Sequence, residues 1–277
     1  MTNDQKLEKA IEAMGYGTGR SFSDVFDDFL EMSLAMLCNN PNDHQRKLLQ
    51  ETLSKEGKRT AFLAALSAYG ECAENYHNPL GEMFMLRISH GQNGQFFTPE
   101  HICEFMAKII EPQGETINDP TCGSGRLLLA GLKIARENGE EPIIYANDLS
   151  YTCARMCLLN LLVNCARGEV SCGNSLLMDI SNIRFFRIDR VMMPNGAYVS
   201  TYWQYTLADV CEVDKLRDEW RMKMLGNGLW VEVIRKKKSE PVIEETAAEP
   251  ISEPEPEIEN EHLTATPKAV QLELELF

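Results

Sequence analysis

The sequence lacks long apolar runs, and no stretch approaches the roughly 20 consecutive apolar residues that a membrane-spanning helix requires. Its start, MTNDQKLEKA, is polar and lacks the apolar core of a secretory signal peptide. We therefore expect a cytoplasmic protein. The length of 277 residues is sufficient for one domain of ordinary size with extensions, or for two small domains.

The sequence also lacks C-x-x-C pairs, although it contains nine cysteines. The odd number and the irregular spacing argue against a disulfide framework and against a zinc site, so we expect no bound metal. Cys153 and Cys157 share one face of an expected helix, where buried thiols are the simplest interpretation.

An excess of positive charge is missing as well, because the net charge is −15. A protein that holds duplex DNA alone usually presents a basic surface, since neutralising phosphates supplies much of the affinity. Arg184, Arg187, Arg190 and the basic run 235–238 could touch phosphates, but a solvated face is the simpler interpretation. A function on DNA would therefore need a partner that helps to hold the DNA.

The periodicity of apolar residues divides the chain into three regions. Residues 1–90 are expected to be helical, with helices over 21–38 and 59–69. Residues 91–238 are expected to form an α/β domain. Residues 239–277 are rich in Glu and Pro, which predicts a disordered acidic tail that ends in an apolar peptide.

Strands and helices alternate within the second region. The expected strands are 115–119, 142–147, 170–173, 183–193 and 228–234, and the expected helices are 100–110, 125–138, 151–167 and 216–224. The alternation over 114–174 predicts a parallel sheet with crossover helices. Ligands of such sheets bind beyond the carboxyl ends of the strands.

The strongest local signal is Asp119-Pro120-Thr121-Cys122-Gly123-Ser124-Gly125, between an expected strand and an expected helix. The two glycines allow a sharp turn and a close approach of the backbone to a ligand, and Asp119 can pair with a cationic amine. The spacing fits neither the G-x-G-x-x-G of nicotinamide dehydrogenases nor a P-loop. An ordinary glycine-rich turn is the alternative interpretation.

Polar residues also follow the next two strands. Asp148, in the sequence Asn147-Asp148-Leu149, suits hydrogen bonds to ribose hydroxyls, although an Asp in this position can also simply cap the next helix. Asn174 is placed to meet an adenine edge or to form a turn. Upstream, Thr98 and Pro99 mark a helix start, and the preceding Phe96 and Phe97 also suit plain core packing.

Taken together, QFFTP, DPTCGSG, AND and GNSL resemble the adenine-N6 DNA methyltransferase domain of type I restriction–modification modification subunits. The resemblance implies a Rossmann-like methyltransferase sheet that binds S-adenosyl-L-methionine. Asp119 would face its methionine amine, Asp148 the ribose and Asn174 the adenine; the family usually has Asp at this last position. The full set of implied cofactor residues is Gln95, Phe96, Phe97, Thr98, Pro99, Asp119, Cys122, Gly123, Ser124, Gly125, Asp148, Leu149 and Asn174.

The chain departs from this family in one respect, because the catalytic motif [DN]-P-P-[FY] is missing from the sequence. At the expected place stands Met193-Pro194-Asn195-Gly196, either a degenerate remnant or, more simply, an Asn-Gly turn. Two functions follow from the resemblance. One is an adenine-specific DNA methyltransferase that works with a partner; the other is an inactive cofactor-binding relative that acts as an adapter on DNA-processing machinery.

The last seven residues, QLELELF, resemble the short peptides by which bacterial DNA-processing proteins dock on the sliding clamp. The resemblance implies partner contacts by Gln271, Leu272, Leu274, Leu276 and Phe277. Two alternatives remain open: an apolar end without a partner, and a strand that pairs back on the domain.

Overall fold

The computed structural model describes residues 1–89, 96–112, 116–177, 181–227 and 229–232. The described residues all belong to one compact unit, Met1–Ile234. Gln95 and the clamp-peptide residues Gln271, Leu272, Leu274, Leu276 and Phe277 lie outside the described residues. None of the helices described is long and apolar enough to span a membrane.

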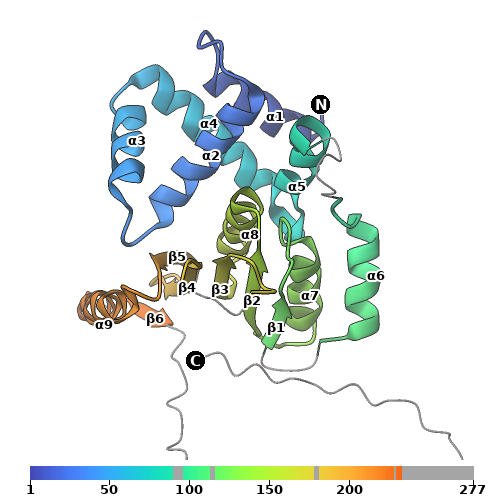
Figure 1. Ribbon diagram of the computed structural model, residues 1–277, viewed down its shortest axis with the longest axis vertical. Helices are drawn as coiled ribbons and strands as arrows, with labels where there is room; N and C mark the ends of the chain where they lie inside the picture. Colours follow the sequence, from blue (N-terminus) through green and yellow to red (C-terminus); the bar gives the residue numbers. More distant parts are fainter. Residues whose placement is uncertain (90–95, 113–115, 178–180, 228, 233–277) are drawn as a thin grey trace, which may run out of the picture. The chain divides into compact units, whose positions relative to one another are not determined.

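The N-terminal region is helical, as predicted (Figure 1). It consists of α1 (Asn3–Met14), α2 (Phe22–Leu37), α3 (Asp43–Leu53), α4 (Glu56–Cys72), η1 (Glu74–Tyr76), α5 (Pro79–Phe84) and η2 (Met85–Ser89). The predicted cap of α2 is confirmed, because Ser21 and Asp24 form a reciprocal capping box. Phe26 and Phe29 of this helix are fully buried, so its apolar stripe belongs to the core.

The first half of the sheet is parallel. Strands β1 (Thr116–Asp119), β2 (Ile143–Asp148) and β3 (Arg167–Cys172) lie side by side, and α7 (Arg126–Glu137) and α8 (Tyr151–Val163) connect them. α6 (Glu100–Ile110) precedes β1. The register pairs Asp119 with Ala146 and Asp148 with Cys172, so the three carboxyl ends meet at one edge of the sheet.

The second half of the sheet is antiparallel, whereas the parallel sheet predicted from the alternation over 114–174 is confirmed in β1, β2 and β3. β4 (Arg184–Met192) pairs antiparallel with β3, β5 (Tyr198–Tyr205) and β6 (Trp230–Glu232), and the strand order is β1-β2-β3-β4-β5 with β6 off this path. Only a short connection joins β3 to β4, and parallel pairing would require a longer crossover. The sequence pattern also missed β5 entirely.

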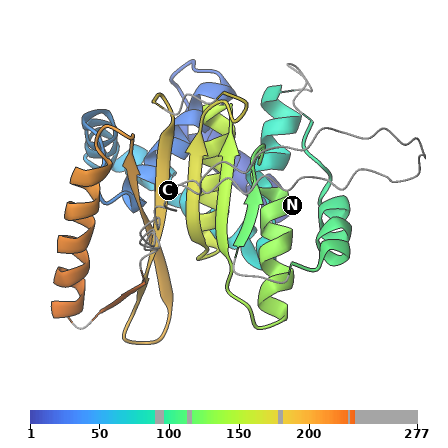
Figure 2. The ribbon, with the colours of Figure 1, turned by 60° about the horizontal axis from the view of Figure 1, so that its bottom comes forward.

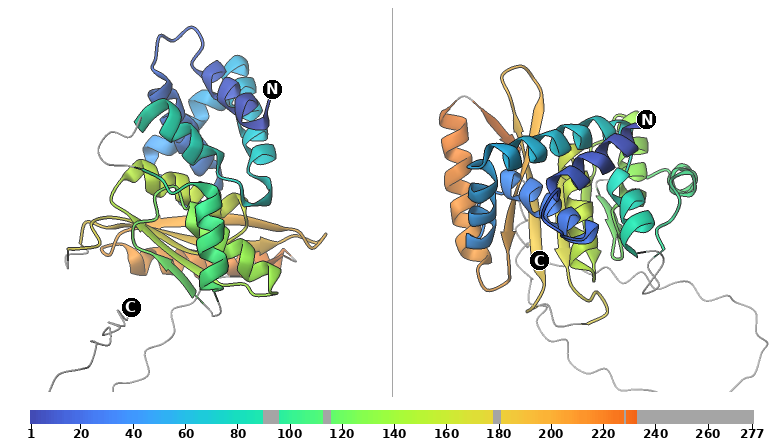
Figure 3. Two further views of the ribbon diagram at one scale, coloured as in Figure 1. Left: turned by 90° about the vertical axis from the view of Figure 1, so that its right-hand side faces the viewer. Right: turned by 90° about the horizontal axis from the view of Figure 1, so that it is seen from above.

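The two faces of the sheet are covered by different helices (Figures 2 and 3). α8 contacts β2, β3 and β5, and it is buried along most of its length beneath α2. On the opposite face α9 (Val210–Gly226) packs against β5 and β6. α8 ends at Val163 rather than at the predicted position 167, because Cys165 adopts a left-handed φ of 50° and β3 begins at Arg167.

Candidate cofactor site

The predicted cofactor residues gather at the carboxyl ends of β1, β2 and β3. The loop 120–125 follows β1, Asp148 ends β2, and Gly173 follows β3. Main-chain hydrogen bonds join the three tips: Cys122 N donates to Asn147 O at 2.8 Å, and Gly173 N donates to Asp148 O at 3.1 Å. The loops therefore form one connected edge.

Both glycines of the loop occupy positions that other residues tolerate poorly. Gly123 has φ 55° and Gly125 has φ 84°, in the left-handed region that disfavours a Cβ. A Cβ on Gly123 would lie 3.0 Å from the ring of Phe97, and a Cβ on Gly125 would lie 2.8 Å from Cys157 Sγ. The loop thus requires glycine for its conformation and also for space.

Asp148 clasps this loop. Its Oδ2 accepts a hydrogen bond from Gly123 N at 2.8 Å, and its Oδ1 accepts one from Ser150 N at 2.8 Å. The second contact supports the local-turn interpretation, whereas the first connects two strand tips. Each carboxylate oxygen has a further lone pair, so hydrogen bonds from ribose hydroxyls remain compatible with this geometry.

Asn147 was not among the predicted site residues, yet its side chain joins all three strand tips. Its Nδ2 donates to Pro120 O at 3.2 Å and to Gly173 O at 3.0 Å, and its Oδ1 accepts from Ser171 Oγ at 2.8 Å. The sequence does carry a signal for this role, because Asn147 is a polar residue directly before the acidic Asp148 at the end of a strand. Asn147 positions the loops that surround Asp148.

Phe97 covers the glycine loop from the side of the preceding segment. Its ring contacts the Gly123 position and stacks on Phe84, with the centroids 5.8 Å apart. Phe96, by contrast, is 75% exposed. The paired aromatics therefore differ: Phe97 packs between the core and the loop, and Phe96 faces solvent.

The side chains of Cys122 and Ser124 point into the core rather than toward solvent, with exposures of 7% and 1%. A side-chain hydrogen bond with Cys157 and burial both raise the pKa of the Cys122 thiol, which stays neutral. Ser124 Oγ accepts from Asn78 Nδ2 at 2.9 Å. Any contact of these two residues with a cofactor would therefore involve their main chain.

A fully buried polar network lies beneath the loop. Asn160 Nδ2 donates to Ser124 O at 2.9 Å and to Asn78 Oδ1 at 3.0 Å, and Tyr69 Oη donates to Asn160 Oδ1 at 2.7 Å. The helical N-terminal region thereby supports the glycine loop. No sequence motif reveals this network, because its members come from α4, the α5 N-cap, the loop and α8.

Arg126 connects the loop to the segment before α6. It is 8% exposed, and it pairs with Glu82 at 2.6 Å and donates to Thr98 O at 3.0 Å. Thr98 is thus held through its main chain, and Pro99 is the N-cap of α6, as the predicted helix start requires. Arg126 was not among the predicted site residues.

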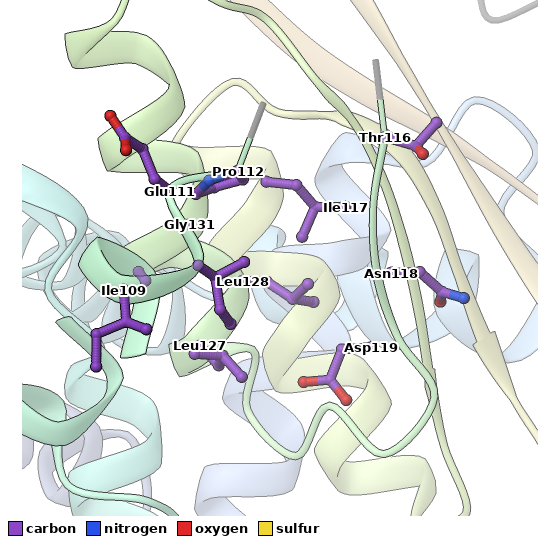
Figure 4. Close-up of a pocket in the computed structure, with 12 residues that line it drawn as sticks. Ile109, Glu111, Pro112, Thr116, Ile117, Asn118, Asp119, Leu127, Leu128 and Gly131 are labelled. Atoms are coloured by element: carbon purple, nitrogen blue, oxygen red, sulfur yellow. The ribbon is translucent and has the colours of Figure 1, made fainter. Parts of the chain in front are cut away.

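Asp119 ends β1 and borders a pocket of about 580 Å³ along the outer edge of that strand (Figure 4). Ile117 and Asp119 point toward α7, and the side chain of Asn118, which also lines the pocket, points away from them. Asp119 Oδ1 accepts from Thr121 N at 3.0 Å. Of the predicted cofactor residues, Asp119 alone lines this pocket, which lies beside the glycine loop between α6, α7 and β1.

Two further predicted residues, Asn174 and Leu149, lie just after the carboxyl ends of β3 and β2. Asn174 Oδ1 accepts from Leu176 N at 3.0 Å, which is the turn that the alternative interpretation anticipated. Leu149 is 72% exposed, directly after Asp148. The structure thus places both beside the loop, with an apolar side chain open to solvent.

The segment 193–196 is a hairpin turn between β4 and β5. Gly196 N donates to Met193 O and Met193 N donates to Ala197 O, both at 2.8 Å, and Gly196 has φ 82°. β4 begins opposite Cys172 and runs away from it, so about 27 Å of strand separates this turn from the glycine loop. The turn cannot serve as a remnant catalytic motif at the site.

The arginines considered for phosphate contact are largely used inside the protein. Arg187 and Arg190 are each 5% exposed, which corrects the interpretation of a solvated face. Arg187 pairs with Glu169 at 3.1 Å and with Asp214 at 2.7 Å, and Arg190 pairs with Glu141 at 2.9 Å. Despite burial, the neighbouring Tyr205 and carboxylates raise the pKa of Arg187.

A glycine-rich loop after the first strand and an aspartate that binds it from the second define an α/β protein with a candidate ligand site at the carboxyl ends of parallel strands. The sequence model of the N-6 DNA methylase family matches residues 81–231, which is more than half of the chain. The chain belongs to this family, and both the predicted family and the predicted α/β fold class are confirmed.

The relatives are longer proteins. The MpnII type I restriction enzyme methylase subunit of Mycoplasma pneumoniae is 26% identical over 170 residues, which cover 57% of this chain and 29% of the relative. The MjaIX methylase subunit of Methanocaldococcus jannaschii is 31% identical over 85 residues, 30% of this chain and 15% of the relative. The chain thus spans less than a third of either relative.

Among solved structures, the type I restriction–modification methyltransferase subunit of Streptococcus thermophilus matches with a TM-score of 0.34 and 17% identity. The match covers 64% of this chain and 40% of that one.

Proposed function

We propose that this protein is the cofactor-binding part of an adenine-specific N6 DNA methyltransferase of restriction–modification type, and that S-adenosyl-L-methionine binds at the tips of β1, β2 and β3. The observation that carries the proposal is the convergence of Phe97, the glycine loop and Asp148 within direct contact of one another. The family supports the chemistry, since its members are N-6 DNA methylases.

The residues present fit this cofactor. Gly123 and Gly125 carry no side chains of their own, and Gly123 stays partly exposed beside Phe97, so a ligand can approach the main chain there closely. Asp148 and Asp119 each keep acceptor capacity for hydroxyl and amine donors beyond the main-chain contacts described above. When bound, the cofactor would supply an electrophilic methyl group, and this chain's residues would hold and orient it.

Calorimetric titration of the purified chain with S-adenosylmethionine tests this assignment. Asp148→Ala should weaken binding about 10-fold or more, because a hydrogen bond to a charged group contributes roughly 1.5–3 kcal/mol and the loop also loses its clasp. Asp119→Ala should weaken it similarly. Asp218→Asn and Glu219→Gln, both on the exposed side of α9, are controls that should bind normally.

Equal affinity of Asp148→Ala, Asp119→Ala and the two controls would contradict the assigned site. Saturable binding that all four variants retain would mean that the cofactor binds elsewhere. No binding by the unaltered chain would contradict the cofactor itself.

Methyl transfer, we propose, requires a second protein. The sequence has no [DN]-P-P-[FY] motif, and its nearest remnant lies at the wrong end of the sheet. Arg126, Arg155, Arg187 and Arg190 are buried in ion pairs within the chain, and the net charge is −15, so a partner would supply positive charge for DNA. Radiolabelled cofactor should thus label DNA only in a reconstituted complex; labelling by the chain alone would refute the requirement.

The missing motif also favours a second function, an inactive cofactor-binding adapter on DNA-processing machinery. The same assay separates the two proposals. Cofactor binding without label in DNA, in the presence of co-purifying partners as well, would favour the adapter. Label in adenine would exclude it.

We further propose a cytoplasmic location, where restriction–modification enzymes meet DNA, and docking of the C-terminal peptide on the sliding clamp. The docking proposal rests on the sequence QLELELF alone. Deleting residues 271–277 should abolish co-purification with the clamp, whereas Lys268→Ala, just upstream, should not. Unchanged recovery after the deletion would dismiss it.

A further inference from the structure

Three side chains with metal-binding atoms converge within the helical N-terminal region, none of them in the glycine loop. Asp4 lies in the first turn of α1, Cys72 is the last residue of α4, and His77 follows η1. Cys72 Sγ is 2.9 Å from Asp4 Oδ1, and His77 Nε2 is 3.0 Å from the same oxygen. The three ligand atoms all lie within 4.8 Å of one another.

The set combines a thiol, an imidazole and a carboxylate, which are the donors that zinc-type cations prefer. Ligand bonds of about 2.0–2.3 Å in a tetrahedron place neighbouring ligand atoms roughly 3.4–3.6 Å apart. The separations of 2.9 and 3.0 Å therefore need to open by about half an ångström. Three protein ligands would leave a fourth position for solvent.

Glu100 supplies the outer contact that metal-binding histidines usually have. Its Oε2 is 3.1 Å from His77 Nδ1, on the side of the ring opposite Asp4. A proton on Nδ1 donated to Glu100 leaves the Nε2 lone pair directed at the cluster, which is the tautomer that a metal requires. Without a cation, the ring needs protons on both nitrogens to satisfy both carboxylates.

The backbone before His77 is held in an unusual conformation. Asn75 and Tyr76 both have positive φ, 57° and 65°, in the left-handed region. For a bulky residue such as Tyr76 this conformation is an outlier, and such strain tends to occur at functional positions. Here it turns the chain directly after α4 so that His77 returns to Cys72 and Asp4.

We propose that Asp4, Cys72 and His77 bind a divalent cation of the zinc class, with Glu100 as the outer partner of His77. Binding replaces the thiol proton of Cys72 and the Nε2 proton of His77 by the metal and releases both protons to solvent. The site would pin the start of α1 and the end of α4 to the start of α6. Because Glu100 directly follows Phe96–Pro99, the cation would also steady the segment that covers the glycine loop.

This inference departs from the sequence prediction of no metal. The ligands stand at positions 4, 72 and 77 and come from separate elements, so no spacing motif reveals them. It does not depend on the proposed methyltransferase function.

Cobalt(II) provides the test, because a thiolate ligand gives it a sulfur-to-metal charge-transfer band and a tetrahedral site gives intense visible bands. The full-length chain is stripped with a chelator and titrated with Co²⁺, and then with Zn²⁺ in calorimetry. We expect one Co²⁺ per chain, a charge-transfer band, and its displacement by Zn²⁺. Cys72→Ser should abolish the band, whereas Cys211→Ser, at an exposed free cysteine, should retain it.

Two variants at partly exposed positions guard against misfolding of Cys72→Ser. Asp4→Asn removes a ligand charge, and Glu100→Gln removes the outer carboxylate; the latter should weaken Zn²⁺ binding about 10- to 100-fold. His101→Ala, the exposed neighbour on α6, should bind normally. Co²⁺ uptake without a charge-transfer band, a band that survives in Cys72→Ser, or equal affinity of Glu100→Gln and His101→Ala would overturn the proposal.

Discussion

Gly125 offers a test of how tightly the glycine loop is packed. The chain supplies a matched control, because Gly139 has nearly the same φ, 80° against 84°, but nothing lies within 4 Å of a Cβ placed on it. A Cβ on Gly125 would meet Cys157 at 2.8 Å from Sγ and 3.4 Å from Cα. The two substitutions by alanine thus share a conformational cost and differ in steric cost.

The expected magnitudes follow from these two terms. A left-handed conformation costs a residue other than glycine about 1–2 kcal/mol, so Gly139→Ala should lower the free energy of unfolding by about that amount. Overpacking of a well-filled core adds about 1–3 kcal/mol, so Gly125→Ala should cost about 2–5 kcal/mol in total. Cys157→Ala removes the Sγ atom, so the double variant should regain part of the free energy of unfolding that the steric clash costs Gly125→Ala.

Urea unfolding followed by circular dichroism and by tryptophan fluorescence measures these changes, and coincident transitions check two-state behaviour. The double variant should lose less free energy of unfolding than the sum of the losses in Gly125→Ala and Cys157→Ala, since the two residues are in direct contact. Equal destabilisation by Gly125→Ala and Gly139→Ala, or no coupling with Cys157→Ala, would refute the close packing of the loop on α8.

Three further predictions concern the packing around the sheet and the loop. Arg217→Met should lower the free energy of unfolding by about 3–5 kcal/mol, because it leaves the fully buried Asp189, 2.7 Å from Arg217 Nε, without its main counter-charge; a loss below 1 kcal/mol would contradict this. Tyr69→Phe should cost about 1–3 kcal/mol in urea unfolding, since Asn160 Oδ1 stays buried and loses its donor. Gly196→Ala, with φ 82° and no close neighbour, should cost about 1–2 kcal/mol and leave cofactor affinity unchanged, which calorimetry checks.

The local elements were predictable wherever chain neighbours alone decide them. Ser21 and Asp24 lie three residues apart and form the predicted capping box, and the helix 100–110 begins after Pro99 as its sequence requires. The strand tips at Asp119 and Asp148 were predicted for the same reason. Parallel strands linked by helices bring their carboxyl ends to one edge, whatever the details of packing.

Tertiary structure alone decided two features, because each depends on residues far apart in the chain. β4 pairs antiparallel with β3, and this direction places the turn at Pro194 and Gly196 far from the glycine loop. The sequence predicted a solvated Arg187, but its side chain is buried and forms ion pairs with Glu169 of β3 and Asp214 of α9. The sequence by itself determined the family, the alternation of strands and helices, and the glycine loop, since consecutive residues specify each of these. Contacts between distant residues determined which side chains face a ligand, which side chains support the glycine loop from below, and which charged groups remain for a partner.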